Sequence, residues 1–235
     1  MEQPCRSDST GAVGSTWVVN RAKGRAGDFH ARELVEPVER SLWVLEVERP
    51  ALVLGSTQPA DHVDRAAVAV AGVEVVRRRS GGGAVLLVPG SALWIDVVLP
   101  RADPWWRDDV GRSTHWLGRV WQSALADLGV AATVHTGALV STPWSTLVCF
   151  AGLGPGEVSA GGRKLVGISQ RRTRAGARFQ CVVHRHWDPA PLLALLDLDD
   201  DQRGRGGSDL AGVATGLDRP TAEVVEALVA HVPRS

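Results

Sequence analysis

Residues 77–83 place three arginines, one serine and three consecutive glycines between two strand-like apolar runs at 73–76 and 84–88. Each glycine loses much conformational entropy on folding, so we do not expect three in a row to serve packing. They allow unusual dihedral angles and let a ligand lie against backbone N–H groups, where an adjacent arginine favours a phosphate or carboxylate. A flexible hairpin tip with a solvated basic flank is the alternative. The strand on each side favours a binding loop.

The apolar periodicity of the chain predicts a mixed succession of strands and helices. Strands are predicted at 44–47, 52–54, 73–76, 84–88, 93–99, 147–150, 157–159, 164–169 and 178–184. Helices are predicted at 61–71, 110–128, 191–196 and 220–231. Residues 199–208 are charged and rich in glycine, which predicts a mobile linker. Because the order does not repeat as β-α-β units, we expect an α+β fold.

Lys164 lies in a second unusual segment, residues 162–172. It is the only lysine besides Lys23, although the chain is rich in arginine. A compact ammonium can contact a carbonyl oxygen and a phosphate together and stabilise developing negative charge. A solvated lysine on an edge strand is the alternative. Beside a glycine turn, the retained lysine indicates a specific role.

Taken together, these segments resemble a known family. Arg-Arg-x-Ser-Gly-Gly-Gly-Ala-Val at 77–85 and Gly-Arg-Lys at 162–164, followed by two hydrophobic residues and Gly-x-small-Gln-Arg, are similar to the lipoate protein ligase A branch of the biotin/lipoate protein ligase family. Residues 53–58 are similar to that family's Ile-Gly-Arg-x-Gln segment, and the resemblance spans about 42–187. It implies a mixed β-sheet flanked by helices, related to class II aminoacyl-tRNA synthetases.

The resemblance also implies a domain organisation. Residues 1–40 would be an N-terminal extension with a short strand and helix, and residues 41–198 the catalytic core. Residues 199–235 would hold the charged linker and a C-terminal helix, without a large accessory domain. Since the full-length ligases use such a domain or a partner subunit in adenylation, an accessory subunit is implied.

An activity and a set of site residues follow from the same resemblance. The enzyme would use ATP and Mg²⁺ to convert lipoate or octanoate into an acyl-adenylate. It would then pass the acyl group to a lysine of lipoyl domains in 2-oxoacid dehydrogenase complexes or of the glycine cleavage carrier protein. Lys164 would contact the acyl carbonyl and the phosphate. The implied binding residues are Arg78, Ser80, Gly81, Gly82, Gly83, Ala84, Gly167 and Ser169.

The sequence departs from the family pattern at two places. The family has a His-Asp pair shortly after the glycines, where this chain has Leu87 and Val88. A His-Gly pair near the last core strand is also absent from 179–184. These substitutions leave open a catalytically silent acyl-binding scaffold of the same fold, an alternative that the retained Lys164 opposes.

Cys149, followed by Phe150, supports a different chemistry. The pair resembles the Cys-Phe of octanoyltransferases in the same family. There a cysteine takes octanoate from acyl carrier protein as a thioester and passes it to the carrier lysine, without a cofactor. A small buried hydrophobic residue is the alternative for Cys149, and it is our interpretation of Cys181.

Composition and charge exclude several other classes. The formal net charge of +0 gives no global field towards nucleic acid or an anionic membrane, and no apolar run is long enough to span a bilayer. Residues 1–16 lack the apolar stretch of a secretion signal, and we expect a frayed terminus there. Three scattered cysteines favour a reducing cytoplasm. We expect no metal site at His184 and His186, because no third ligand is evident.

Overall fold

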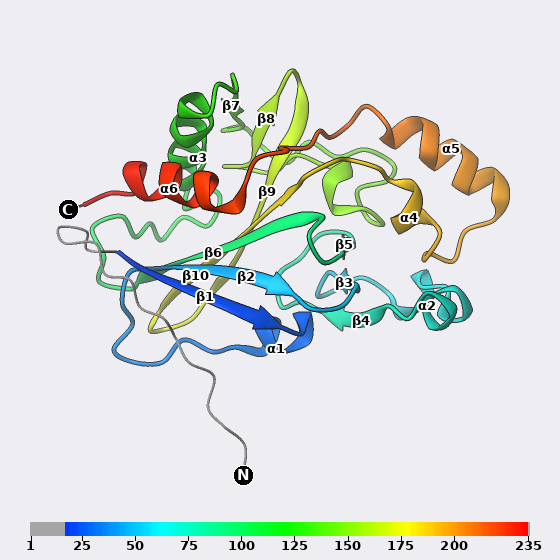
Figure 1. Cartoon of the computed structure of the whole chain (residues 1–235), viewed down its shortest axis with the longest axis horizontal. Coiled ribbons are helices and arrows are strands. Elements are labelled where there is room, and N and C mark those ends of the chain that lie inside the picture. The colour runs from blue at the N-terminus through cyan, green and yellow to red at the C-terminus, as the bar shows by residue number, and fades with distance from the viewer. Residues whose placement is uncertain (1–16, 235) are drawn as a thin grey trace, which may run out of the picture.

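The computed structural model describes residues 17–234 and is centred on a seven-stranded mixed sheet (Figure 1). Its strands, in order across the sheet, are β1 (Val18–Gly24), β2 (Ser41–Val47), β6 (Ala92–Pro100), β10 (Gly176–His184), β9 (Arg163–Arg172), β8 (Val158–Ala160) and β7 (Thr133–Val134). β1 and β2 are parallel, whereas the other neighbouring strands are antiparallel. The predicted α+β fold with a mixed sheet and flanking helices is confirmed.

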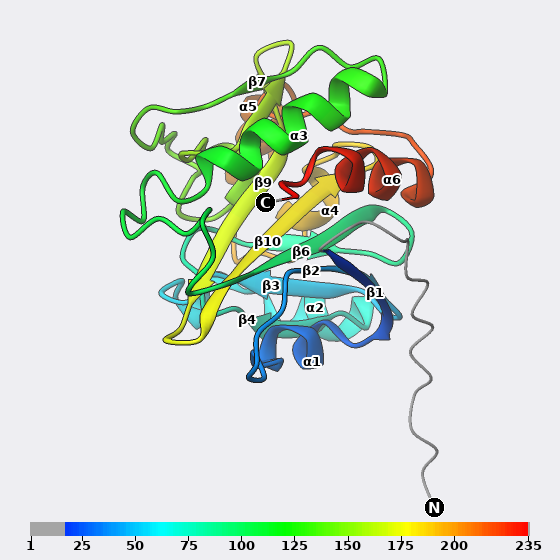
Figure 2. The ribbon, with the colours of Figure 1, turned by 90° about the vertical axis from the view of Figure 1, so that its left-hand side faces the viewer.

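Two helices cover one face of the large sheet: α3 (His115–Asp127) and α6 (Thr221–His231) (Figure 2). Successive side chains of a strand point to opposite faces, and alternate residues of β10, such as Phe179 and Cys181, are buried with these helices. Trp121 of α3 is fully buried in the same cluster. This layer forms the larger part of the core.

A second, three-stranded sheet lies on the opposite face of the large sheet (Figure 2). Its order is β4 (Glu74–Arg77), β3 (Ala51–Leu54) and β5 (Val85–Leu87), accompanied by α1 (Ala26–Ala31) and α2 (Arg65–Ala71). Val53 and Val85 of the small sheet are buried with Leu45 and Trp94 of the large one. The remaining helices are α4 (Ala190–Leu193), α5 (Asp200–Leu210) and two short 3-10 helices at Ala60–His62 and Cys149–Ala151. The binding loop that sequence predicts connects β4 to β5, at the boundary between the two sheets.

The predicted mobile linker at 199–208 is wrong, because α5 occupies this segment. Asp199 caps its first turn by accepting a hydrogen bond from the Gln202 backbone, while the Gln202 side chain accepts one from the Asp199 backbone. A Cβ on Gly206 would lie 2.9 Å from the Trp144 ring, so this glycine lets the helix pack closely. The charged, glycine-rich composition predicted a solvated linker, but the Asp199 cap and the contact with Trp144 stabilise a helix.

Three other predicted elements differ from the structure. The helix predicted at 61–71 is a 3-10 helix at Ala60–His62 followed by α2. The segment 147–150 is not a strand; Val148 makes an isolated bridge to Ala84, and a 3-10 helix follows. The helix predicted from residue 110 begins only at His115. The hydroxyl of Thr114 donates instead to the carbonyl oxygen of Pro155 at 2.7 Å, a long-range contact that sequence periodicity does not encode.

Two sequence expectations concern location and the N-terminus. Within residues 17–234, no helix is both long and apolar enough to cross a membrane. Cys5 and the predicted frayed terminus lie outside the described residues.

Candidate functional site

Close backbone contacts explain Gly55 and one of the three loop glycines, Gly83, whereas the backbone conformation explains Gly82. A Cβ on Gly55 would lie 1.8 Å from the Gly82 carbonyl oxygen, and one on Gly83 would lie 2.5 Å from the Val148 nitrogen. Gly82 has φ +96°, which a residue with a side chain rarely adopts. The expectation that the glycines do not serve packing is therefore wrong for Gly83, whereas the expected unusual dihedral angle is confirmed at Gly82. Gly81 has no atom within 4 Å of its Cβ position and is open to a ligand.

Arg78 organises this loop from the inside. The side chain is 5% exposed, and its Nη2 donates to the carbonyl oxygens of Gly81 at 2.7 Å and Gly83 at 2.9 Å. Nη2 also lies 3.6 Å from Cys149 Sγ. Arg78 thus fixes the loop and places a guanidinium beside the thiol.

The loop is also joined to β9. Ser80 Oγ donates to Ser169 Oγ at 3.1 Å, and backbone hydrogen bonds link Ala84 to Leu147 and Cys149. The binding loop, the Cys149 segment and β9 therefore meet around one space, although they are distant in the sequence.

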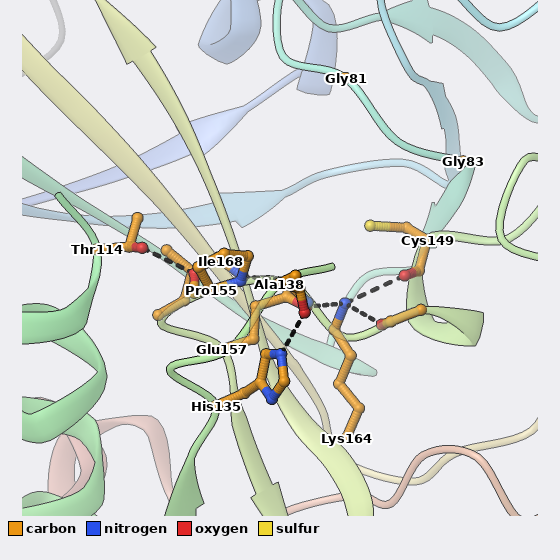
Figure 3. Close-up of polar contacts among 12 residues, drawn as sticks. Gly81, Gly83, Thr114, His135, Ala138, Cys149, Pro155, Glu157, Lys164 and Ile168 are labelled. Carbon is orange, nitrogen blue, oxygen red and sulfur yellow. Dashed lines mark hydrogen bonds and ion pairs between the residues drawn. The ribbon is translucent and has the colours of Figure 1, made fainter. Parts of the chain in front are cut away.

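Lys164 lies behind the wall of this space, and Figure 3 shows its polar contacts. Its Nζ lies 2.7 Å from Glu157 Oε2 and donates to the carbonyl oxygens of Cys149 at 3.1 Å and Gly152 at 3.0 Å. Glu157 also accepts from the backbone N–H groups of Gly154 and Ile168. The lysine is 4% exposed, so it is a buried and fully partnered ammonium rather than a solvated edge-strand residue.

A narrow cavity lies between the two sheets at this point. Its floor and roof are largely apolar and include Gly167, Val182 and Trp94 from the large sheet and Val53, Val85 and Leu87 from the small one. Arg78, Cys149 and Ser169 contribute polar groups. Apolar walls with a few polar groups are typical of a small-molecule site.

His30 and Gln180 form a polar pair in the same cavity. Their Nδ1 and Nε2 atoms lie 3.2 Å apart, and the imidazole packs on Trp94 with ring centroids 4.7 Å apart. Burial lowers the pKa of His30 to about 3, with Arg178 and Arg78 adding to the effect. His30 is therefore neutral at physiological pH.

A buried ion pair fixes the surroundings of His30. Asp96 accepts a hydrogen bond from Trp94 Nε1 at 2.7 Å and pairs with Arg178. Arg178 also donates to the carbonyl oxygen of Arg32 at 3.1 Å, at the end of α1. The Asp96–Arg178 ion pair therefore positions both the Trp94 ring, on which His30 packs, and the end of α1, the helix that contains His30.

Two arginines hold a carboxylate just outside the binding loop. Glu33 contacts Arg79 at 2.7 Å and Arg171 at 2.5 Å, and these arginines lower its pKa. Arg79 immediately precedes Ser80 in the loop, and Arg171 lies two residues after Ser169 on β9. Arg79 and Arg171 therefore form a site beside the loop that binds a carboxylate.

Two further residues that the sequence analysis considered, Cys181 and His184, do not line the cavity. Cys181 is fully buried in the core, and burial raises the pKa of its thiol, as expected for a core residue. His184 packs against Phe150 and Trp187, and burial lowers its pKa to about 4. Among the described residues, no three His, Cys, Asp or Glu side chains come together as a metal site would need.

The sequence-derived site residues occupy distinct places. Arg78, Cys149, Gly167 and Ser169 line the cavity. Ser80 bonds to Ser169, Ala84 is buried against the Cys149 segment, and Gly82 lies close to Cys149 Sγ. Gly83 packs on Val148, and Lys164 lies behind the wall.

Three polar residues of the cavity, Glu157, His30 and Gln180, escaped the sequence analysis. Glu157 has a detectable signal, because a carboxylate stands at the start of the predicted hairpin that carries Lys164. His30 has none, since only the packing of α1 over the large sheet brings it to the cavity.

The fold and this site define an enzyme of the lipoate ligase and transferase class. More particularly, residues 28–231 match the family described as the lipoyl protein ligase A/B catalytic domain, and the chain belongs to that family.

Solved structures with the same fold include several ligases. The bipartite lipoate protein ligase of Thermoplasma acidophilum, studied with its E2 lipoyl domain, aligns with a TM-score of 0.69 and 17% identity, covering 91% of this chain and 80% of that one. A T. acidophilum lipoate ligase structure with bound lipoic acid gives 0.68 and 19%, covering 93% and 84%. A lipoate-protein ligase A bound with ATP gives 0.65 and 18%, covering 92% and 83%. No curated protein matches the sequence.

Proposed function

We propose that this chain attaches a lipoate-type acyl group to a lysine of a lipoyl carrier domain through an acyl-adenylate. The carboxylate of the acid would attack the α-phosphorus of ATP and displace pyrophosphate. The carrier amine would then attack the acyl carbonyl, so that an amide forms and AMP leaves. Two of the similar structures support these substrates by their own ligands, lipoic acid and ATP.

The observation that carries the proposal is the position of Lys164. Its Cε lies 3.4 Å from where a Cβ on Gly167 would stand, and Gly167 lines the cavity. The lysine side chain therefore lies directly behind Gly167, on the other side of which an acyl group would bind. The ammonium already contacts Glu157, Cys149 and Gly152, so in each step it would exchange one of these contacts for the acyl carbonyl oxygen, whose negative charge it would stabilise.

The arginine pair at Glu33 supports a nucleotide. Phosphate oxygens need cationic donors, and Arg79 and Arg171 already share one carboxylate beside the binding loop. Mg²⁺ would arrive with the nucleotide and offset part of its charge. Lipoyl domains of 2-oxoacid dehydrogenase complexes or the glycine cleavage carrier protein are the acceptors we propose, with an accessory subunit as a further partner.

A thioester route is the second candidate, supported by the placement of Cys149. Its thiol lines the cavity beside the Arg78 guanidinium, which would stabilise a thiolate. The thiolate would attack an octanoyl thioester of acyl carrier protein and release that carrier's thiol. The lipoyl lysine would then take the octanoyl group and regenerate Cys149.

Intact-mass measurement of a lipoyl domain distinguishes the routes. Lipoate with MgATP and octanoyl-carrier protein are each tested with wild type, Lys164→Ala and Cys149→Ala. The ligase is supported by acylation with lipoate and ATP that Lys164→Ala loses and Cys149→Ala keeps. Transfer only from the octanoyl carrier, lost in Cys149→Ala, would replace it with the thioester route. Absence of acylation, with the accessory subunit supplied, would favour a silent scaffold.

A further inference from the structure

Two cavities of the molecule meet at Leu87 and Trp94. Both residues line the narrow cavity that contains Gly167, and both also line a groove of about 550 Å³. The groove lies where the pairing of β2 with β6 ends, at Trp94. It opens to solvent beside Lys23 and Glu46, which form an exposed ion pair. The two spaces are therefore neighbours, and we call Leu87 and Trp94 the partition between them.

The narrow cavity runs from Gly167 across the large sheet to Trp94. Val182 of β10 pairs with Gly167 of β9 on one side and with Trp94 of β6 on the other, and all three residues line the cavity. Two strand spacings correspond to about 10 Å. An eight-carbon acid, with C–C bonds of about 1.5 Å, extends over about 9 Å. An acid of this length whose carboxyl group lies beside Gly167 would therefore end at Trp94.

The partition is held rigidly. Leu87 and Trp94 are each 2% exposed. The indole of Trp94 donates to Asp96 at 2.7 Å and packs against the rings of Phe29 and His30. Leu87 lies on β5, whose backbone is paired with β3. Because close-packed side chains resist displacement, the partition blocks the path of a chain that reaches it.

The volume that a longer chain needs lies beyond the partition. The narrow cavity holds about 40 Å³, so its side chains must move apart for any acid, whereas the groove is already open. The groove also presents apolar side chains, including Val47 and Leu93. Each methylene that an apolar surface buries raises the affinity of a ligand about fourfold. A chain that passed Leu87 would therefore continue to gain affinity in the groove.

We propose that Leu87 and Trp94 set the chain-length limit of the acid, at about eight carbons, by closing the acyl cavity off from the groove. This inference rests on the proposed function, because it takes Gly167, in front of Lys164, as the carboxyl end. Leu87 stands where the family pattern has a histidine, so the end of the cavity is apolar in this chain. Octanoate and lipoate fit this limit, whereas longer fatty acids exceed it.

Binding of free straight-chain acids tests the limit without ATP or a carrier domain. We would titrate the protein with hexanoate, octanoate, decanoate and dodecanoate by calorimetry. For wild type we expect the affinity to rise about fourfold per methylene up to octanoate and to fall about tenfold or more from octanoate to dodecanoate. In Leu87→Ala the affinity should continue to rise through dodecanoate, and in Leu87→Val, which removes one methylene, the limit should shift less. Leu86→Ala, on the same strand but lining neither cavity, is the matched control and should keep the wild-type limit.

A double variant distinguishes passage into the groove from a general loosening of the cavity. Ala92 lines the groove, so Ala92→Leu added to Leu87→Ala should fill that space and restore the limit near octanoate. An undiminished rise to dodecanoate in the double variant would overturn the assignment of the groove.

Three other results would overturn the inference: a rise of affinity to dodecanoate in wild type, an unchanged limit in both Leu87 variants, or absence of binding by every acid. The milder Leu87→Val keeps the test valid if Leu87→Ala fails to fold. Failure of the proposed function is distinguishable, because the acids would then bind with the expected limit while no lipoyl domain gained mass.

Discussion

Lys164 Nζ lies 2.7 Å from Glu157 Oε2, with 4% and 8% of the two side chains exposed. Glu157 immediately precedes β8 and Lys164 lies near the start of β9, and the backbone N–H groups of Gly154 and Ile168 also donate to the carboxylate. A buried ion pair that is fully hydrogen-bonded holds an ammonium at low exposure without leaving it free to solvent. The geometry therefore explains how a charged lysine is kept buried behind the wall of an apolar cavity.

Removing the carboxylate should destabilise the fold. Glu157→Ala leaves a buried ammonium without its counter-charge, and we expect a loss of about 3 kcal/mol or more in the free energy of unfolding. Urea denaturation measures it. Lys164→Met combined with Glu157→Ala should cost less than the sum of the two single changes. Strict additivity would show that the pair is not energetically coupled.

The glycines of the binding loop should differ in their tolerance of a methyl group. Gly83→Ala would push a Cβ against the Val148 backbone, and we expect a loss of about 1–3 kcal/mol in stability. Gly81→Ala meets no atom within 4 Å and should change stability by less than about 0.5 kcal/mol. Thermal unfolding of the two variants compares them. Equal destabilisation would contradict the close-packing explanation.

Arg78→Lys should loosen the binding loop. A lysine lacks the planar fork that reaches both Gly81 and Gly83 carbonyl oxygens. We expect faster amide hydrogen exchange across residues 79–84 and slower acylation by about tenfold or more. The neighbouring, exposed Arg79→Lys is the control for exchange, since Arg79 pairs at the surface with Glu33 and its side chain makes no hydrogen bond to the loop carbonyl oxygens within residues 17–234. Unchanged exchange in Arg78→Lys would contradict this role.

Replacing Glu33 should improve nucleotide binding. Its carboxylate occupies Arg79 and Arg171, so Glu33→Gln removes a competing anion. We expect the Kd for ATP, measured by calorimetry, to fall severalfold at low salt, with a smaller change at high salt because exposed charges are screened. Glu46→Gln, which alters an exposed ion pair on β2, is the matched control. Weaker ATP binding in Glu33→Gln would reject the anion site.

Stability should fall as the pH drops below the ordinary pKa of histidine. Burial lowers the pKa of His30 to about 3 and of His184 to about 4, against 6.5 in the unfolded chain. Between about pH 6.5 and 4 the unfolded state therefore binds more protons than the folded state, and each histidine contributes a loss of up to about 1.4 kcal/mol per pH unit. Denaturation at pH 7, 6 and 5 measures the slope. His184→Gln should reduce it, and a slope equal to wild type would contradict burial of a neutral ring.

The sequence by itself determined the fold class and the family, and it singled out the glycine loop and the lysine segment as candidate site segments. Local signals sufficed there: apolar alternation for β9 and β10, and motif spacing for residues 77–85 and 162–171. It failed at 199–208, where composition indicated a linker but the Asp199 cap and the contact of Gly206 with Trp144 support α5.

Only the tertiary structure decided what surrounds these motifs. Glycines are required at 55 and 83 by the backbones that approach from Gly82 and Val148, and no sequence pattern records such a contact. His30 reaches the cavity because α1 packs on the face of the large sheet that carries Trp94 and Gln180. Periodicity encodes which side of an element is buried, whereas the partner that each buried atom meets depends on how distant segments pack together.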